Sequence, residues 1–555
     1  MYKWHLILGI IFVTGSNYFG ILIPQKIREA LDLVQNKIIE YKHLDAVLRE
    51  SKYDDIGYTL LIFGLVVTGF VIIKGLLMYF MRQTIIVMSR LIEYDMRKEI
   101  FSHLQTLDQS FYRKSQTGDI MARISEDVSK VRNYLGPGVL YGINLITLFI
   151  MTIYAMFKVD VYLSIFVLLP LPILSVSIYY VSKLINEKST VIQQQLSLLN
   201  STAQETYSGI RIVKSYVKEN QFVRYFEEQS EEFKKRSLNL AKVEAYFQPI
   251  MTLLIALSTL MVVIVGGFQV HEGRLTAGNI AEFILYVNML TWPVTSIGWI
   301  ASVVQEAEAS QTRINELLAK RTSLTNINND VYTIKGEIEF RNVSFTYPNT
   351  GINALKHVNF RILPGQKLAI MGKTASGKTT IAELISRMFD ADEGTVLIDG
   401  KDIRNHNINV VRERIGYVPQ DVFLFSDTVA ANIAFGKPET SEEEIELFAD
   451  YACVKDDIDK LSKKFNTMVG ERGVTLSGGQ KQRISIARAI IRKPDIIILD
   501  DALSSVDTNT EQQILAGFTK ILANKTTITI THRATNLMNY DRIIVLENGQ
   551  IAEDG

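Results

Sequence analysis

The chain has 555 residues, of which 47% are hydrophobic and 21% charged, and its 59 basic residues balance 59 acidic ones. This length indicates more than one domain, and the apolar content excludes a mostly disordered chain. The zero net charge argues against a nucleic-acid binder, and the single cysteine, Cys453, excludes an intramolecular disulfide and a multi-cysteine metal site.

Six apolar segments in the first half of the chain are long enough to cross a bilayer, which takes about 20 apolar residues in a helix. They are residues 4–24, 57–81, 134–157, 161–182, 246–270 and 276–303. The first is long for a signal peptide and lacks a small-residue cleavage pattern, so we expect six membrane spans. The fourth contains Pro170 and Pro172, which a membrane helix tolerates when neighbouring groups bond the freed backbone.

Long polar stretches separate the second span from the third and the fourth from the fifth. Both keep apolar residues at three- and four-residue spacing, as at Val128, Val131 and Leu135. We therefore expect the membrane helices to continue beyond the bilayer as helical arms, and not to be joined by separate loop domains. The turns are expected near Gln109–Gly118 and near Ser208–Arg211.

Lys74 and Glu282 are the main charged residues inside these spans. Because Lys74 lies about two turns from Arg82, we expect its side chain to extend toward the cytosolic interface. Glu282 is the better candidate of the two for a substrate contact. Aromatic residues of the later spans suit lipids, amphipathic drugs and peptides equally: Tyr154, Tyr286, Trp292 and Trp299.

After Gln311 the sequence changes to a soluble α/β pattern. We predict a helical membrane domain over residues 1–319, a polar linker over 320–336 and an α/β nucleotide-binding domain over 337–555. In this last part short β-rich runs alternate with helical ones. The runs are Ile338–Phe340, Leu368–Met371, Ile496–Leu499, Thr527–Thr531 and Ile543–Leu546.

A phosphate-binding pattern, G-x-x-x-x-G-K-[ST], follows one of these runs and precedes a helix predicted over Thr380–Met388. Its glycines let backbone N–H groups converge on phosphate oxygens, and the helix N-terminus adds the positive end of its dipole. Lys378 is predicted to contact the outer phosphates, and the Thr379 hydroxyl to bind Mg²⁺. The predicted nucleotide-binding residues are Gly372, Lys373, Thr374, Ala375, Ser376, Gly377, Lys378, Thr379 and Thr380.

Two further motifs accompany this loop. The apolar run ending in Asp500 and Asp501 is expected to place Asp500 at the phosphate end of the sheet, where its carboxylate can hold Mg²⁺. The segment Ser477, Gly478, Gly479 and Gln480 is expected to open a second helix whose N-terminus attracts anions. Each motif alone is weak, because strand-end aspartates also cap turns and Ser-Gly-Gly is also an ordinary helix cap.

These motifs, followed by Thr531-His532-Arg533, resemble the ATP-binding-cassette family in content and order. The six spans resemble the exporter branch, fused as a half-transporter, and the resemblance covers essentially the whole chain. It implies ATP-driven export or flipping of an amphipathic or hydrophobic small molecule, lipid or peptide, with ATP and Mg²⁺ bound between two cassettes of a dimer. It also implies a multi-pass protein of the cell (inner) membrane with a cytosolic cassette and no nucleic-acid partner.

The resemblance assigns roles to further residues. Tyr347 corresponds to the aromatic that stacks on adenine, Gln420 to the glutamine that touches Mg²⁺ and water, and His532 to the histidine that orients the γ-phosphate. The Ser477–Gln480 segment is implied to contact the ATP held by the partner cassette. The segment Thr467–Gly473 is implied to contact the helix turns, and the segment Ser504–Asp507 is implied to contact the opposite cassette.

Two positions depart from the family pattern. Ala375 stands where a further glycine is usual, a change that an unstrained φ can accommodate. Asp501 stands where a glutamate usually positions the attacking water, and its carboxylate is set back by one methylene, about 1.5 Å. Because a misplacement of about 1 Å can cost about 10²-fold in rate, we expect slow hydrolysis, unless backbone or water compensates.

A weakened site of this kind resembles the weaker member of a heterodimeric exporter, so a heterodimer is favoured over a homodimer. Soluble cassette proteins that act on DNA or ribosomes lack membrane spans and are therefore disfavoured. The nearer alternative is a non-transport membrane protein of the same architecture, such as an ATP-gated channel or a regulatory subunit. Few intramembrane charges are present to form the charged rings that a channel pore requires.

Overall fold

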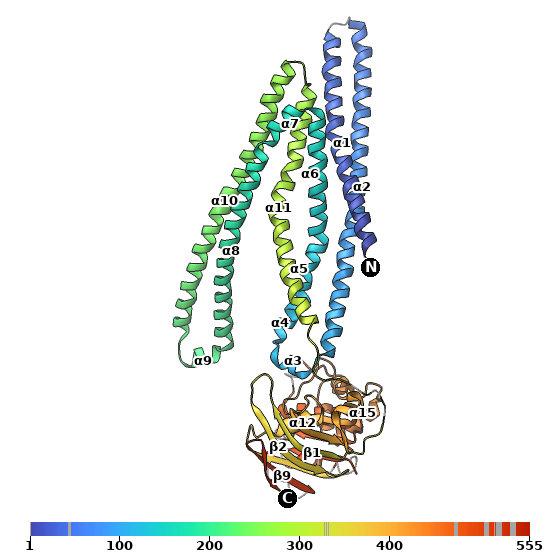
Figure 1. The fold of residues 1–555 in the computed structure, drawn as a ribbon, viewed down its shortest axis with the longest axis vertical. Helices are drawn as coiled ribbons and strands as arrows, with labels where there is room; N and C mark the ends of the chain where they lie inside the picture. The colour runs from blue at the N-terminus through green and yellow to red at the C-terminus, as the bar shows by residue number, and fades with distance from the viewer. Residues whose placement is uncertain are drawn as a thin grey trace. The chain divides into compact units, whose positions relative to one another are not determined.

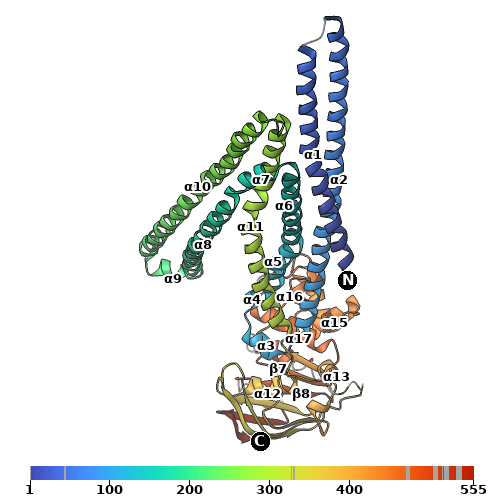
Figure 2. The ribbon, with the colours of Figure 1, turned by 45° about the horizontal axis from the view of Figure 1, so that its top comes forward.

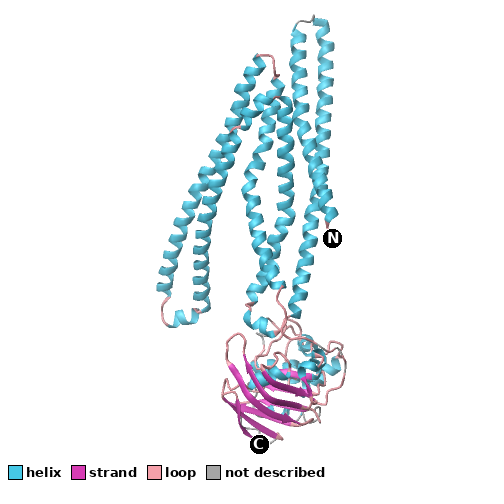
Figure 3. Cartoon of the chain, in the orientation of Figure 1, coloured by secondary structure: helices cyan, strands magenta, loops and turns pink. Residues whose placement is uncertain are grey.

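The computed structural model of the protein describes residues 2–42, 46–326, 328, 330, 332–470, 476–503, 510–514, 517, 524–532 and 540–555. The chain divides into two compact units, and it passes between them at three points. The first unit contains Met1–His103 and Met121–Ala319, and the second contains Leu104–Ile120 and Lys320–Gly555. In their described residues the first unit is helical, whereas the second combines helices and strands (Figures 1 and 3).

Long helices make up the first unit. Its elements, with the ends of α2 and α4 reaching into the second unit, are α1 (Lys3–Lys42), α2 (Ala46–Thr106), α4 (Thr117–Ala122), η1 (Arg123–Asp127), α5 (Val128–Asn133), η2 (Tyr134–Gly138), α6 (Val139–Val159), α7 (Val161–Leu168), α8 (Pro170–Ser208), α9 (Ile210–Ser215), α10 (Glu219–His271) and α11 (Ala277–Leu318). Here η1 and η2 are single π-helical turns. The helices α8 and α10 run side by side, joined by the short α9 (Figures 1 and 2).

Five helical stretches in the described part of the chain are long and apolar enough to cross a membrane: Lys3–Lys37, Ile56–Thr106, Thr117–Val159, Glu219–His271 and Ala277–Leu318. They correspond to five of the six predicted spans. The remaining segment, residues 161–182, is divided between α7 and α8 at Leu169. Because Pro170 has no backbone N–H, it cannot extend the hydrogen-bond ladder of α7. A sixth span therefore stays a prediction.

Both predicted chain reversals of the helical arms are confirmed by the element boundaries. After α2 the chain turns through the short helix α3 (Gln109–Lys114) into α4, and after α8 it turns through α9 into α10. On the opposite ends of the helices, Thr276 caps α11 through a reciprocal pair of hydrogen bonds with Asn279. Such a cap satisfies backbone N–H groups that have no partner within the helix.

The two intramembrane charges lie differently from the sequence prediction. The carbonyl oxygen of Lys74 accepts a hydrogen bond from Ser16, and its Nζ lies beside Gly20, one turn further along α1. The side chain thus extends away from Arg82, because helical side chains lean toward the N-terminus of their own helix. The expected extension toward the cytosolic end is therefore wrong.

Glu282 is fully buried. Its carboxylate forms an ion pair with Arg28 of α1 at 3.1 Å and accepts a hydrogen bond from Tyr286 at 2.8 Å. A carboxylate in this setting requires such partners, because an unpaired buried charge is strongly destabilising. The contacts assign Glu282 to the packing of α1 against α11, which leaves the suggestion of a substrate contact without support.

The second unit is built on two sheets (Figure 3). An antiparallel sheet has the order β2-β1-β4-β5, formed by β1 (Ile338–Thr346), β2 (Asn353–Ile362), β4 (Glu393–Ile398) and β5 (Lys401–Asp402). A second sheet has the order β10-β9-β3-β8-β7-β6, formed by β3 (Lys367–Gly372), β6 (Ile415–Val418), β7 (Ile496–Asp500), β8 (Thr526–Ile530), β9 (Arg542–Glu547) and β10 (Gln550–Asp554).

Parallel pairing in the larger sheet follows from the sequence of its strands. Every residue of β7 and β8 is buried, and β7 reads Ile-Ile-Ile-Leu-Asp, as expected of a strand covered on both faces. The strands β6, β7, β8, β3 and β9 are parallel, and only β10 runs antiparallel to its neighbour. Their carboxyl ends therefore meet at one edge, which brings together Gly372, Asp500 and Ile530.

Helices and short turns surround these sheets. They are α12 (Lys378–Ile385), η3 (Ile403–Asn405), α13 (Ile408–Arg414), α14 (Val429–Ala434), α15 (Glu442–Tyr451), α16 (Lys455–Asp459), η4 (Lys464–Asn466) and α17 (Gly478–Ile490). One apolar core joins both sheets to α12, and a second lies among α14, α15, α17 and β7. All five β-rich runs predicted from the sequence coincide with strands, although β8 ends at Ile530, one residue before the predicted end of its run.

The segment Leu104–Ile120 belongs to this second unit although it continues α2. Asp108, the residue before α3, accepts hydrogen bonds from the backbone N–H and the hydroxyl of Ser323, both at 2.6 Å, and one from Thr322. Burial alone would raise the pKa of Asp108, but the hydrogen bonds from Ser110, Ser323 and Phe111 hold it well below its usual range. The carboxylate thus ties the turn after α2 to the chain that follows α11.

Candidate functional site

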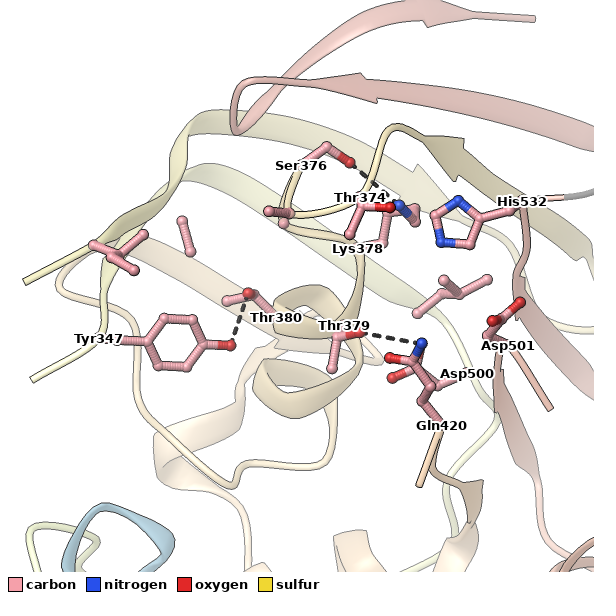
Figure 4. Close-up of a pocket in the computed structure, with 15 residues that line it drawn as sticks. Tyr347, Thr374, Ser376, Lys378, Thr379, Thr380, Gln420, Asp500, Asp501 and His532 are labelled. Carbon is pink, nitrogen blue, oxygen red and sulfur yellow. Dashed lines mark hydrogen bonds between the residues drawn. The ribbon is translucent and has the colours of Figure 1, made fainter. Parts of the chain in front are cut away.

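A cleft of about 270 Å³ opens at the carboxyl ends of β3, β7 and β8 (Figure 4). Residues from the predicted phosphate loop, from the Asp500 strand and from the start of the domain line it together. The lining residues are Tyr347, Ile352, Ala354, Thr374, Ala375, Ser376, Gly377, Lys378, Thr379, Thr380, Gln420, Asp500, Asp501, Ile530 and His532.

The phosphate loop connects β3 to α12, as the pattern predicts. Its backbone requires glycine at both ends, since Gly372 has φ +150° and Gly377 has φ +101°. A side chain at Gly377 would also collide with the carbonyl oxygen of Ala354. The helix begins at Lys378 and ends at Ile385, so the predicted bounds of Thr380–Met388 are wrong at both ends. The early start directs the N-terminus of α12 into the cleft.

Ala375 adopts the left-handed conformation, with φ +64°. The expectation of an unstrained φ at this position is therefore wrong. A residue with a Cβ pays about 1–2 kcal/mol in this region, because the Cβ approaches the following carbonyl oxygen. The glycine usual in the family would avoid that cost.

Replacing Ala375 with glycine is expected to stabilise the nucleotide-free protein by about 0.5–1 kcal/mol, since the relief of strain exceeds the entropy lost by glycine on folding. Differential scanning calorimetry, which records the unfolding transition of the cassette, measures the change. Gly365, whose φ is +78°, offers the reverse control: Gly365→Ala should destabilise the protein. Equal or lower stability of Ala375→Gly would contradict the strain argument.

Lys378 is buried in the floor of the loop, with 6% of its surface exposed. Its Nζ donates hydrogen bonds to the carbonyl oxygens of Gly372 at 2.8 Å and Lys373 at 2.7 Å. Burial lowers the pKa of Lys378, and the charges of Asp501 and Asp500 oppose that effect. The ammonium group is thus fixed within the loop where phosphate oxygens are expected to bind.

Thr379 and Asp500 form the second half of the predicted chemistry. The Thr379 hydroxyl donates to Asp500 Oδ1 at 3.2 Å, whereas the buried Asp500 Oδ2 has no hydrogen-bond partner among the residues that the structure describes. Burial raises the pKa of Asp500 to about 6, assisted by the nearby charges of Asp501 and Glu383. An unpartnered buried carboxylate oxygen beside a hydroxyl is a donor set that Mg²⁺ prefers, so these residues fit the metal.

The raised pKa of Asp500 predicts a pH-dependent cost to the folded state. Between pH about 4 and about 6 the folded protein binds a proton that the unfolded chain has released, so the contribution of Asp500 to stability falls as pH rises through this window. Asp500→Asn should remove this loss and stabilise the metal-free, nucleotide-free protein above pH 6, by an amount on the order of 2–3 kcal/mol. Unfolding temperatures measured in EDTA from pH 4 to pH 7 test this, and a difference between the two proteins that does not change with pH would refute it.

The three residues assigned to hydrolysis lie around the same cleft. Asp501 continues β7 with its backbone N–H bonded to Ile530 at 2.9 Å, and its φ of +50° lies in the left-handed region that aspartate tolerates better than most residues. In Figure 4 Asp501 and His532 lie on the same side of the cleft, and Gln420 lies beside Asp500.

Tyr347 lies at the other end of the cleft from Asp501 (Figure 4). Its hydroxyl is 2.9 Å from Thr380 Oγ1 and donates to Glu383 Oε2 at 2.7 Å. Burial raises the pKa of Tyr347 and also that of Glu383. Glu383 was not singled out from the sequence, because its partner Tyr347 lies 36 positions away and its place on α12 carries no motif.

The Ser477–Gln480 segment lies outside this cleft, at the N-terminus of α17. The Ser477 hydroxyl accepts from the backbone N–H of Gln480, and the Gln480 side chain accepts from the backbone N–H of Ser477. The prediction that Ser477 opens a helix is confirmed. Of the other implied segments, residues 471–473 and 504–507 lie outside the described residues.

Comparison with known families accounts for both units. Residues 6–294 match the family described as "ABC transporter transmembrane region". Residues 355–504, in the nucleotide-binding unit, match the family described as "ABC transporter". The chain belongs to the ABC transporter family. The predicted fold class, a helical transmembrane domain followed by an α/β cassette, is thereby confirmed for the transporter.

Known relatives share most of their length with the transporter. It is 37% identical to "Probable multidrug resistance ABC transporter ATP-binding/permease protein YheI" of Bacillus subtilis, and the match covers 84% of this chain and 80% of that one. It is 36% identical to "Multidrug resistance-like ATP-binding protein MdlA" of Escherichia coli, covering 87% of this chain and 82% of that one. It is also 33% identical to an "ATP-dependent lipid A-core flippase" of Escherichia coli, covering 88% and 84%.

A solved structure shows the same fold. "Structure of a bacterial Atm1-family ABC exporter with ATP bound" superposes with a TM-score of 0.76 at 22% identity, over 100% of this chain and 95% of that one. Together with the relatives, these matches establish a multi-pass membrane protein whose ATP hydrolysis is coupled to transport. The transporter is an ATP-driven exporter, and the alternative of a channel or regulatory subunit gains no support.

Proposed function

We propose that the transporter moves an amphipathic or hydrophobic substrate, a small molecule, lipid or peptide, out of or across the cell (inner) membrane. The proposal is supported by the cleft that gathers Lys378, Thr379 and Asp500 under one helix N-terminus. It is also supported by relatives named for multidrug resistance and for lipid A-core flipping, both of which imply apolar or amphipathic cargo. The cassette then lies in the cytosol, where ATP is available.

In the proposed mechanism, ATP occupies the cleft with its base on Tyr347 and its phosphates in the loop. Backbone N–H groups of the loop and the N-terminus of α12 hold the phosphate oxygens, and Lys378 neutralises charge on the outer phosphates. Mg²⁺ fits against Thr379, Asp500 and Gln420, where it would offset phosphate charge when bound. His532 orients the γ-phosphate, and Asp501 positions and polarises the attacking water.

The location of the Ser477–Gln480 segment supports a dimer. Ser477–Gln480 does not line the cleft that contains the phosphate loop of the same chain. Its capped, glycine-rich helix N-terminus is suited to contact ATP held by a second cassette. Two nucleotides are then held between two cassettes, and alternating access of the membrane domains follows their closing and opening.

Asp501 supports a heterodimer over a homodimer. The transporter supplies a shortened carboxylate to one ATP site and an intact Ser477–Gln480 motif to the other. A partner half-transporter with the usual glutamate would restore one efficient site. Purification of the tagged transporter from its native membrane tests this: a second half-transporter in equal amount is expected. Recovery of a pure homodimer with rapid ATP turnover would overturn the heterodimer proposal.

The export proposal itself is tested with inside-out vesicles that contain the transporter. ATP is expected to drive accumulation of a fluorescent amphipathic dye or lipid, because the exposed cassette faces the added nucleotide. The Lys378→Ala variant in equal amount is the control. No difference between the two preparations, with a panel of dyes, lipids and peptides, would contradict the proposal.

A further inference from the structure

Arg113, in the short helix α3, contacts the residue assigned to the adenine base. Its guanidinium carbon lies 4.8 Å from the centre of the Tyr347 ring and 5.2 Å from that of Phe389. The guanidinium also forms an ion pair with the Glu383 carboxylate. All four residues belong to the second unit, which includes Leu104–Ile120.

Glu383 connects these groups. It is buried on α12 with 7% of its surface exposed, and it uses both carboxylate oxygens. One oxygen accepts from Arg113, and the other accepts from the Tyr347 hydroxyl. The position of the Tyr347 ring is therefore fixed by a charged pair, one member of which comes from the turn after α2 and the other from the helix of the phosphate loop.

Tyr347 contacts Arg113 and also lines the nucleotide cleft. The tyrosine lines the cleft together with Ile352 and Ala354, whereas Arg113 is absent from the cleft lining. In Figure 4 the Tyr347 ring stands at the edge of the cleft, apart from the phosphate-binding residues Lys378 and Ser376. The direct contact of Arg113 is thus with the residue assigned to the base, and its connection toward the phosphates runs indirectly through Glu383 and α12.

We propose that Arg113 is a positioning residue for nucleotide recognition: held by Glu383, its guanidinium braces the Tyr347 ring so that the turn after α2 contributes to affinity for the base. A planar cation on one side of an aromatic ring stabilises that ring and restricts its rotation, so less freedom is lost when a base stacks on it. This inference rests on the proposed placement of adenine on Tyr347.

The test compares binding of Mg²⁺-ATP with binding of Mg²⁺-tripolyphosphate, which has the phosphates but no base. Isothermal titration calorimetry on the full-length transporter in lipid nanodiscs gives both dissociation constants. Arg113→Ala is expected to weaken ATP binding about 3- to 10-fold and to leave tripolyphosphate binding within about twofold. Lys114→Ala, which removes an exposed charge from the same helix, is the matched control and should change neither.

Two further variants keep the outcome decisive. Glu383→Gln preserves size and should reduce ATP affinity in the same direction as Arg113→Ala, even if the latter folds poorly. Arg113→Lys retains the ion pair without the planar group and should lie between Arg113→Ala and the unmodified protein. Equal weakening of both ligands would show a general structural role and overturn the proposal, as would unchanged ATP binding.

The same data separate this inference from the assignment of Tyr347. If the unmodified transporter gains nothing from the base and Tyr347→Ala leaves ATP binding unchanged, the placement of adenine on Tyr347 is wrong. If Tyr347→Ala weakens ATP binding selectively while Arg113→Ala does not, only the role of Arg113 fails.

Discussion

Replacing Lys378 with alanine should lower ATP turnover about 10²- to 10³-fold, the usual effect of removing one fixed donor from a site that stabilises developing charge. The buried ammonium is held within the loop by two carbonyl oxygens, which it exchanges for phosphate oxygens when nucleotide binds. Among the lining residues described, Lys378 is the one that carries a permanent positive charge. Its loss removes the side-chain charge that neutralises the outer phosphates.

Lys373 provides the internal comparison for this experiment. It lies in the same loop, but its side chain is 86% exposed and pairs with Glu547 at the surface. Exposed ion pairs contribute little, so Lys373→Ala should lower turnover less than about threefold. Steady-state phosphate release at saturating ATP measures both variants. Similar losses for the two lysines would mean that total loop charge, and not the fixed position of Lys378, governs the reaction.

Lengthening Asp501 to glutamate should raise ATP turnover of the transporter purified alone by about 10- to 100-fold. The shortened carboxylate is set back about 1.5 Å from the position of the usual glutamate, and misplacement by about 1 Å can cost about 10²-fold. Asp501 has φ +50°, in the left-handed region that glutamate adopts less favourably than aspartate. A small loss of folding stability should therefore accompany the gain in turnover. Faster hydrolysis in a slightly less stable protein is the expected pattern.

Asp501→Gln is the matched control, because glutamine has the length of glutamate without its charge. It should not increase turnover, whereas Asp501→Glu should. The rates are measured on detergent-purified protein at equal concentrations. The activity that remains in the presence of vanadate is subtracted as background. Rapid turnover by the unmodified protein, with no gain from glutamate, would show that Asp501 supports normal hydrolysis and would remove the main argument for a heterodimer.

The sequence predicted those features that depend on local pattern. The phosphate loop was recognisable because its glycines, Lys378 and Thr379 lie within eight positions between a strand and a helix. Buried strands such as β7 were recognisable from continuous apolar runs, and the cap at Ser477 from the residue types that satisfy free N–H groups. For the same reason five of the six predicted spans coincide with apolar helices.

The features that the sequence could not predict depend on contacts between distant residues or on backbone angles. The left-handed φ of Ala375 is set by the shape of the loop, and alanine itself gives no sign of it. The ion pair of Arg113 with Glu383 joins positions 270 residues apart. The burial of Glu282 beside Arg28 depends on how α1 packs against α11, so a lone intramembrane carboxylate was open to a functional interpretation that its partner removes.

The assignment of Leu104–Ile120 to the second unit has a mechanical consequence. The chain crosses between the units at His103–Leu104, Ile120–Met121 and Ala319–Lys320, and the last of these crossings leads directly into residues 320–555. The segment Leu104–Ile120 is held to the rest of its unit by non-covalent contacts, such as those of Asp108 with Ser323 and of Arg113 with Glu383. Any force on residues 320–555 would therefore reach α11 along the backbone, but would reach α2 and α4 through hydrogen bonds and ion pairs that can break and re-form.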